Sequence, residues 1–231
     1  MTSVANGIRV AIDGPSGSGK SSVSKKVAAH LGIGYLDTGA MYRALTWYCL
    51  DRGIDLDDLG AVADAVTAMP LEMGTDPSAP SISMGGTRID TDIRTTRIAE
   101  VVSKVATNLQ VRPKLQQRQR ELMAQIAADQ GGVVAEGRDI TTVVAPDADV
   151  RILMVASEAA RLARRSKELH GGADDAAIAA TRTQIVDRDK ADSTVSSFMS
   201  AADGVVTLDT SDLTFQQSVE AVLTLVERAR G

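Results

Sequence analysis

A glycine-rich stretch near the start of the chain, IDGPSGSGK at residues 12–20, constrains the fold more than any other feature. The apolar residues directly before it predict a short buried strand. After it, Val23, Val27 and Leu31 recur at four-residue intervals, which predicts a helix. Residues 14–21 then fit the pattern G-x-x-x-x-G-K-[ST] in the strand, loop and helix order that the pattern needs. The stretch predicts a phosphate-binding loop, because glycines let backbone N–H groups converge on an anion and the helix directs its positive end there.

We expect this loop to bind the phosphates of a nucleotide through a continuous set of residues. The set consists of Gly14, Pro15, Ser16, Gly17, Ser18, Gly19, Lys20, Ser21 and Ser22. Lys20 would reach the outer phosphates and Ser21 would ligate Mg²⁺. The alternative is a glycine-rich turn that contains a lysine by chance. The predicted strand and helix on either side of the loop argue against that alternative.

The rest of the chain alternates apolar strands with helical patterns, which indicates an α/β fold with parallel βα units. With 231 residues, 44% of them hydrophobic, the chain can bury the core of one such domain with a small insert. Strands are expected near 8–13, 33–36, 133–136, 149–155 and 204–208. Helices are expected near 20–31, 39–52, 59–68, 92–107, 112–129, 157–169, 174–188 and 214–229. Proline and glycine cluster around short apolar alternations in residues 70–90, which predicts a small β insert, with an irregular loop as the alternative.

Composition excludes several classes of function. A net charge of −5 and only 3% aromatic residues argue against binding of a nucleic-acid polymer. No apolar run approaches a membrane span and no signal peptide is evident, so we expect a cytoplasmic protein without membrane contact, and a monomer. Cys49 lies in an apolar run and is expected to be a buried thiol. Two histidines are too few for a metal cluster, and His30 is expected at the surface.

Two further stretches have charged residues where a ligand could bind. In YLDTGAMYR, Thr38 is a suitable N-cap for a second helix, and Arg43 follows it by just over one turn, so this helix start is a second potential phosphate site. In VVAEGRDITTVV, Arg138 and Asp139 follow an apolar strand, and ligands bind at the carboxyl ends of strands in open α/β sheets. Arg138 could bind a phosphate while Asp139 accepts from an amino group. The alternative is a structural ion pair between these two neighbours.

A set of arginines follows in the second half of the chain. Arg161, Arg164 and Arg165 project from one face of a predicted helix. A lid that closes over a transferring phosphate would use such a cluster, whereas a surface network with Glu158 and Glu168 is the alternative.

In VDRDKADS, Arg188 and Asp192 lie one helical turn apart, where a surface salt bridge is the simplest interpretation of the pair alone. Two phosphate-type sites, converging arginines and several carboxylates together indicate two anionic substrates instead of one.

Several of these motifs occur in the same order and at similar separations in bacterial cytidylate kinases. The motifs are GPSGSGKSS, DTGAMYR, the helix around Ser103 that continues to VRPKL, EGRD with TTVVAPDADV, and RDKADST. The resemblance spans nearly the whole chain and implies a P-loop NTPase fold similar to adenylate kinases, with a five-stranded parallel sheet, a small β insert and a helical lid. It implies transfer of the γ-phosphoryl group of ATP to CMP or dCMP with Mg²⁺. The implied regions are a core (1–38, 108–160 and 190–231), an acceptor-binding region (39–107) and a lid (approximately 161–189).

The resemblance also implies a role for individual positions. Residues 14–22 match the loop for the ATP phosphates. The family's lid arginines match Arg161, Arg164 and Arg165. Its acceptor-phosphate positions match Arg43, Arg138 and Arg188, next to Thr38, and its sugar contact matches Asp192. Its cytosine contacts match Ser103, Arg112 and Asp139. Physical logic agrees, because a carboxylate paired with an arginine and a hydroxyl can distinguish the amino group of cytosine from the carbonyl of uracil.

One position departs from the family pattern. After RDKADST the family usually has an arginine, where this chain has Val195. Loss of one charge-assisted hydrogen bond should raise the KM for the acceptor, at a cost on the order of 1–3 kcal/mol if nothing replaces it. Two other functions use the same loop: a sugar or shikimate-type kinase, which does not need the cytosine-reading set, and a nucleotide-dependent regulatory module. The chain lacks the Asn-Lys-x-Asp stretch of a typical GTP switch.

Overall fold

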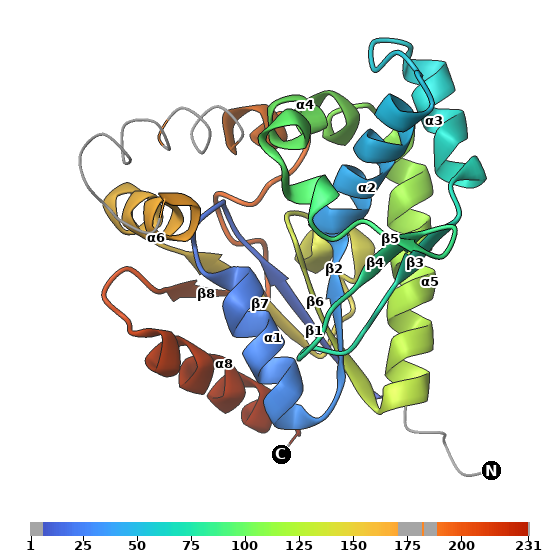
Figure 1. Ribbon diagram of the computed structural model, residues 1–231. Helices are drawn as coiled ribbons and strands as arrows, with labels where there is room; N and C mark the ends of the chain where they lie inside the picture. The colour runs from blue at the N-terminus through green and yellow to red at the C-terminus, as the bar shows by residue number, and fades with distance from the viewer. Residues whose placement is uncertain (1–6, 171–181, 183–188, 231) are drawn as a thin grey trace, which may run out of the picture.

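A computed structural model describes residues 7–170, Arg182 and residues 189–230 of the chain (Figure 1). The predicted helix over 174–188 lies outside these residues except for Arg182, which is helical. Residues 189–193 are also helical, although no helix was predicted there. No helix within the described part of the chain is both long enough and apolar enough to cross a membrane.

The five predicted strands form one parallel sheet, which confirms the expected α/β class. The strands are β1 (Ile8–Asp13), β2 (Gly34–Asp37), β6 (Gly132–Gly137), β7 (Val150–Val155) and β8 (Val206–Asp209), in the order β2-β6-β1-β7-β8. Helices α1 (Lys20–Leu31) and α8 (Phe215–Arg230) pack on one face of the sheet, and α5 (Val111–Gln130) covers the other (Figure 1). Because both faces are covered, the central strands consist of almost uninterrupted buried residues.

Most of the segment predicted to bind the acceptor, residues 39–107, contributes to a hydrophobic cluster separate from those of the sheet. It contains α2 (Thr38–Asp51), α3 (Leu59–Ala68), β3 (Leu71–Met73), β4 (Ile82–Met84), β5 (Thr87–Arg88), the short 3₁₀ helix η1 (Asp92–Arg94) and α4 (Thr96–Ala106). Strands β3, β4 and β5 form an antiparallel sheet, so the predicted β insert is confirmed. Cys49 is buried as predicted, and burial raises the pKa of its thiol to about 11.

The prediction of one helix over residues 92–107 is wrong. Thr95 has an extended backbone (ψ 157°) and separates η1 from α4. Its hydroxyl donates a 2.9 Å hydrogen bond to the carbonyl oxygen of Asp92. Such local side-chain bonds compete with helix formation, which explains the break.

The prediction that Thr38 caps α2 is also wrong. The N-cap is Asp37, whose carboxylate accepts a 2.9 Å hydrogen bond from the amide of Ala40. The Thr38 hydroxyl instead donates to the carbonyl oxygen of Glu136 at 2.7 Å, which ties the start of α2 to the end of β6.

A buried carboxylate, Asp13, connects the end of β1 to residues that the sequence left unassigned. Residues Ile140–Val144 form a short π-helix, η2. The Asp13 carboxylate accepts from the Ile140 amide at 3.0 Å, the Thr141 amide at 2.8 Å and the Thr141 hydroxyl at 2.6 Å. Burial raises the pKa of Asp13 from 3.8 to about 6 despite these hydrogen bonds.

This raised pKa predicts how Asp13 affects stability. Because the folded pKa exceeds the unfolded one, protonation favours the folded state, and this contribution is lost as pH rises through about 6. Urea unfolding should show that the stability of wild type relative to Asp13→Asn falls by roughly 1–2 kcal/mol between about pH 5 and pH 7.5. A difference between the two proteins that stays constant over this range would contradict the account.

Candidate active site

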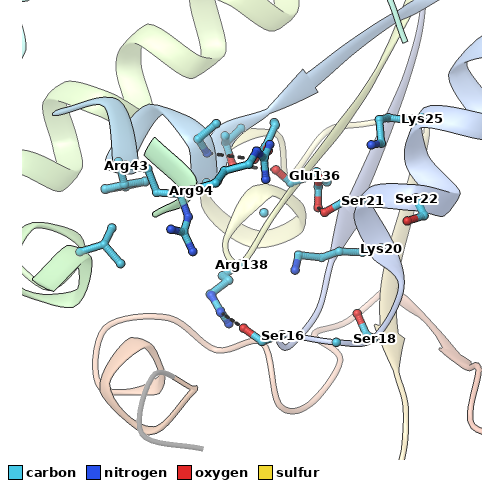
Figure 2. Close-up of a pocket in the computed structure, with 18 of the residues that line it drawn as sticks. Ser16, Ser18, Lys20, Ser21, Ser22, Lys25, Arg43, Arg94, Glu136 and Arg138 are labelled. Carbon is cyan, nitrogen blue, oxygen red and sulfur yellow. Dashed lines mark hydrogen bonds and ion pairs between the residues drawn. The ribbon is translucent and has the colours of Figure 1, made fainter. Parts of the chain in front are cut away.

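One large cavity lies at the carboxyl ends of the parallel strands, where ligands bind in open α/β sheets. Its volume is about 1270 Å³, above the usual range of roughly 300–1,000 Å³ for one small ligand. The phosphate-binding loop lines one side and α2, η1 and α4 line the other. Lys20, Arg94 and Arg138 surround the same space in Figure 2. The cavity therefore has room for two ligands between the loop and the segment predicted to bind the acceptor.

The loop has the backbone that the glycine pattern predicts. Gly17 and Gly19 adopt left-handed conformations with φ of 77° and 91°. A Cβ at Gly17 would lie 2.7 Å from the Arg161 carbonyl oxygen, so a larger residue would push the loop and α6 (Glu158–His170) apart. Helix α1 begins at Lys20, and Lys20, Ser21 and Ser22 line the cavity.

Ser21 contacts a buried carboxylate that the sequence analysis did not assign to the site. Its hydroxyl donates to the Glu136 carboxylate at 2.8 Å, and the Tyr35 hydroxyl donates to the other carboxylate oxygen at 2.6 Å. Burial raises the pKa of Glu136, and the neighbouring Asp37 adds to this effect. Burial together with Glu136 also raises the pKa of Tyr35. The hydroxyl oxygens of Ser21 and Tyr35 and the Glu136 carboxylate therefore form a cluster of oxygen atoms at the first turn of α1.

Two of the predicted lid arginines contact the loop directly. Arg161, only 8% exposed, donates to the Ser16 carbonyl oxygen at 3.0 Å and pairs with Asp189. Arg164 donates to the Ser18 carbonyl oxygen at 3.3 Å, and both Arg164 and Arg165 line the cavity. Arg161 therefore belongs to a buried network at the loop, and not to the surface network that was the alternative.

Of the two acidic partners in that alternative, Glu158 forms a 3.0 Å ion pair with Arg182. The side chain of Glu168 lies outside the described part of the structure.

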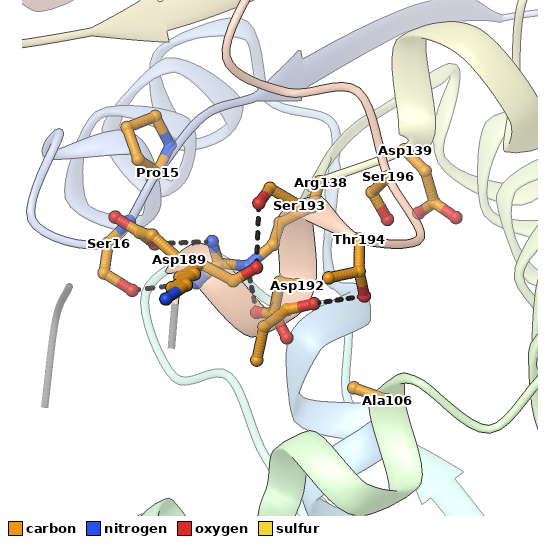
Figure 3. Close-up of polar contacts among 12 residues, drawn as sticks. Pro15, Ser16, Ala106, Arg138, Asp139, Asp189, Asp192, Ser193, Thr194 and Ser196 are labelled. Atoms are coloured by element: carbon orange, nitrogen blue, oxygen red, sulfur yellow. Dashed lines mark hydrogen bonds and ion pairs between the residues drawn. The ribbon is translucent and has the colours of Figure 1, made fainter. Parts of the chain in front are cut away.

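Asp189, which sequence reasoning missed, joins three segments of the site (Figure 3). Its buried carboxylate accepts from the Ser16 amide at 3.1 Å and from Arg138 at 2.9 Å, and it also pairs with Arg161. Arg138 additionally pairs with Asp192 at 2.7 Å. The loop at Ser16, the end of β6 and helix α6 therefore share one carboxylate.

A second buried polar cluster surrounds Asp139. Arg112 and Gln116 both donate to the same Asp139 carboxylate oxygen at 2.7 Å. The Ser196 hydroxyl accepts from Arg112 at 2.9 Å. Because Arg138 and Asp139 pair with other residues, the alternative of an ion pair between these neighbours does not hold. Ser103 lines the cavity on the α4 side of this cluster.

The predicted residues that remain are Arg43, Thr38 and Arg188. Arg43 is buried in α2, donates to the Ile93 carbonyl oxygen at 3.2 Å and lines the cavity. Thr38 also lines the cavity, although its hydroxyl donates a hydrogen bond to the backbone carbonyl oxygen of Glu136. Arg188 lies outside the described residues, so both interpretations of it, a salt bridge with Asp192 and a phosphate contact, stay predictions.

Besides Glu136, three contributors were missed for different reasons. Gln116 lies four residues after Arg112 on a predicted helix, so its position on the same helix face could have been found from the sequence. Asp189 and Arg94 reach the site only through tertiary packing, and no sequence spacing relates them to the loop.

Comparison with known proteins gives the family. The family model for cytidylate kinase matches residues 10–228. A cytidylate kinase from Streptomyces avermitilis is 49% identical over 223 residues, which cover 96% of this chain and 94% of that protein. One from Cutibacterium acnes is 44% identical over 220 residues, covering 94% of this chain and 95% of that protein. In this chain the predicted phosphate-binding loop and a buried arginine–carboxylate cluster lie around one cavity. The chain belongs to the cytidylate kinase family.

Proposed function

We propose that this chain transfers the γ-phosphoryl group of ATP to CMP and dCMP. The single observation that carries the proposal is that one cavity connects the phosphate-binding loop to the Arg112–Asp139 pair. Cytosine presents an amino donor beside hydrogen-bond acceptors. A buried carboxylate can accept from the amino group, while an arginine and the Ser103 hydroxyl can donate to the acceptors.

The same cluster supplies discrimination against uracil. Uracil would place a carbonyl oxygen where cytosine has its amino group, so two acceptors would face each other in a buried site. Gln116 donates to Asp139 together with Arg112 and thereby fixes the orientation of the carboxylate. A carboxylate held by two donors cannot rotate away from a mismatched base without losing both hydrogen bonds.

The donor phosphates would bind along residues 14–22, with Lys20 and the lid arginines around the γ-phosphoryl group. Arg164 and Arg165 line the cavity directly. One terminal nitrogen of Arg161 contacts Ser16 and Asp189, so a phosphate contact would use its other N–H groups. This role of Arg161 is proposed from the family pattern and from its position next to the loop.

Mg²⁺ fits the residues beside the loop. Ser21 and Glu136 offer hydroxyl and carboxylate oxygens, the ligand type that Mg²⁺ prefers. Within the described residues, no group of three or more His, Cys, Asp or Glu side chains is placed to hold a metal ion. Mg²⁺ in nucleotide sites is commonly bound through one or two protein ligands together with substrate phosphates and water. When bound, the ion would neutralise phosphate charge. The Ser21 hydroxyl donates its hydrogen bond to Glu136, so an oxygen lone pair remains for this role.

The acceptor phosphate would bind to Arg43 and Arg138 from opposite sides of the cavity, with Arg188 as a further predicted contact. The contacts of Arg138 with Ser16, Asp189 and Asp192 involve three of its five N–H donors. Transfer needs positioning and charge neutralisation more than a strong base, since the acceptor phosphate is already a nucleophile. Closure of the lid would exclude water as a competing acceptor.

The contact expected from the arginine missing at Val195 has a candidate substitute. Ser196, the next residue, lines the cavity and accepts from Arg112 at 2.9 Å, which leaves its hydroxyl proton available to the acceptor nucleotide. A neutral hydroxyl gives a weaker bond than a guanidinium. The expected rise in the KM for the acceptor therefore stays a prediction.

An acceptor panel tests the proposed function. ADP release from ATP should be measured with CMP, dCMP, UMP, dTMP, AMP, GMP and shikimate, with Mg²⁺ and again with excess EDTA. We expect Mg²⁺-dependent turnover with CMP and dCMP. Efficient turnover of shikimate or a purine nucleotide, with none for CMP, would contradict the proposal.

A further inference from the structure

Phe198 is a fully buried aromatic residue to which the sequence analysis assigned no role. Among the described residues, the three hydrophobic core clusters do not include it. Its ring instead lies against the guanidinium of Arg138, with 4.7 Å between the guanidinium carbon and the ring centroid. Phe198 follows three residues after Val195, in the segment where this chain departs from the family pattern. The ring therefore packs against an arginine of the site and not within a core cluster.

The edge of the Arg138 guanidinium is held by three contacts. Its Nε pairs with Asp192 at 2.7 Å, and one terminal nitrogen donates to Asp189 at 2.9 Å. The other terminal nitrogen donates to the Ser16 hydroxyl at 2.8 Å (Figure 2). One further N–H group remains on each terminal nitrogen. Because hydrogen bonds tolerate moderate bending, these edge contacts restrict the tilt of the guanidinium plane less than its position.

The ring of Phe198 covers the guanidinium from the side away from the large cavity. Arg138 lines the large cavity, and Phe198 does not. Phe198 lines a second cavity of about 310 Å³, which Arg138 does not line. An aromatic face attracts a guanidinium through its quadrupole, and the attraction is larger where both groups are shielded from water. The Arg138 side chain is only 13% exposed, so this condition is met.

We propose that Phe198 is a positioning residue for Arg138. The ring fixes the tilt of the guanidinium so that its two remaining N–H groups meet an anionic ligand together. The inference rests on the proposed function, in which Arg138 binds the acceptor phosphate. Bidentate binding of a phosphate needs the guanidinium plane aligned with the phosphate oxygens, and a plane that is set in advance needs no ordering when the ligand binds. Because Phe198 does not line the large cavity, it acts only through Arg138.

A space-filling role for Phe198 is the competing explanation, since a large apolar side chain would close the second cavity with or without an aromatic face. The two explanations differ in the ligand that is affected. Loss of the correct tilt weakens binding of a nucleotide, whose phosphate contacts Arg138, and leaves binding of the corresponding nucleoside unchanged. Loss of packing that displaces the whole segment disturbs both ligands equally.

The Nε–H signal of Arg138 in a ¹H–¹⁵N spectrum tests the contact without any nucleotide. The signal is assigned by its absence from the spectrum of Arg138→Lys. Protons above an aromatic face are shielded, so we expect Phe198→Leu, which removes the ring, to move this signal downfield. Phe198→Tyr, which keeps the ring face, should leave it near its wild-type position. A signal that Phe198→Leu does not move would overturn the inference.

Calorimetric titration with CMP and with cytidine tests the effect on binding. Phe198→Leu should bind CMP about fivefold to tenfold more weakly, as for loss of a buried cation–π contact, while the Kd for cytidine changes less than about twofold. Phe198→Tyr should keep most of the CMP affinity. Leu153→Ala is the matched control, because Leu153 is buried and lines the same second cavity. It should lower the stability in urea unfolding and leave the ratio of the two affinities unchanged.

The other outcomes overturn the inference. Equal losses for CMP and cytidine in Phe198→Leu would assign the ring a space-filling role, and unchanged CMP binding would show that it does not position Arg138. If Phe198→Leu does not fold, Phe198→Met, which also lacks a ring, gives the same comparison. The proposed function fails separately, if wild type does not phosphorylate CMP, because the Arg138 signal is measured without a nucleotide.

Discussion

Replacing Lys20 with alanine should lower kcat by about 10²-fold to 10³-fold, the usual cost of removing one charged donor from a developing transition state. Lys20 begins α1 and lines the cavity beside Ser21, where the pattern of the loop directs its ammonium group toward the outer phosphates. Because the ammonium group acts on charge that moves during transfer, kcat should fall more than the affinity for CMP.

Lys26→Ala is the matched control for this experiment. Lys26 lies on the same helix but is exposed and does not line the cavity, so its loss should leave kcat within about twofold of wild type. Circular dichroism would verify that both variants fold. A Lys20→Ala variant that keeps more than a third of the wild-type kcat would show that the loop does not hold the transferring phosphate.

Replacing Asp189 with alanine should destabilise the protein by about 3–5 kcal/mol, because removal of one partner leaves buried charge uncompensated. Arg138 and Arg161 are 13% and 10% exposed at their side chains, and both donate to this carboxylate. The Ser16 amide would also lose its acceptor. Activity should fall as well, because the loop, the end of β6 and the lid lose their common contact.

Urea unfolding checks this prediction against a surface ion pair in the same chain. Asp147 pairs with Arg9 at 3.1 Å, but its side chain is 71% exposed. Its replacement by alanine should cost less than about 1 kcal/mol. Equal stabilities for Asp189→Ala and Asp147→Ala would contradict the role of Asp189 as a shared buried partner.

The sheet and the main helices could be predicted because their signals are local. Short apolar runs bounded by glycine, proline and charged residues predicted all five parallel strands, and periodic apolar residues predicted the helices that cover them. The break at Thr95 was missed, since a single hydroxyl bond to Asp92 interrupts an otherwise helical pattern. The cap of α2 was misplaced by one residue, because both Asp37 and Thr38 have side chains suited to capping.

The candidate site was only partly predictable. The phosphate-binding loop and the residues of the EGRD stretch have sequence patterns, and the fold brings them to one cavity. The contacts that orient them come from residues distant in sequence: Asp189 is 173 positions from Ser16, and Ser196 is 84 positions from Arg112. No periodicity relates such pairs, so only the packed structure reveals them.

The central claim, that the Asp139 cluster reads cytosine, is tested most directly by the ratio of kcat/KM for CMP to that for UMP. Wild type should favour CMP by at least about 10²-fold, since a buried carboxylate rejects a base whose carbonyl faces it. Asp139→Asn adds an amide that can donate to uracil, so the ratio should fall about tenfold or more while the KM for ATP stays near its wild-type value. Equal turnover of UMP by wild type, or a ratio that Asp139→Asn leaves unchanged, would contradict the claim.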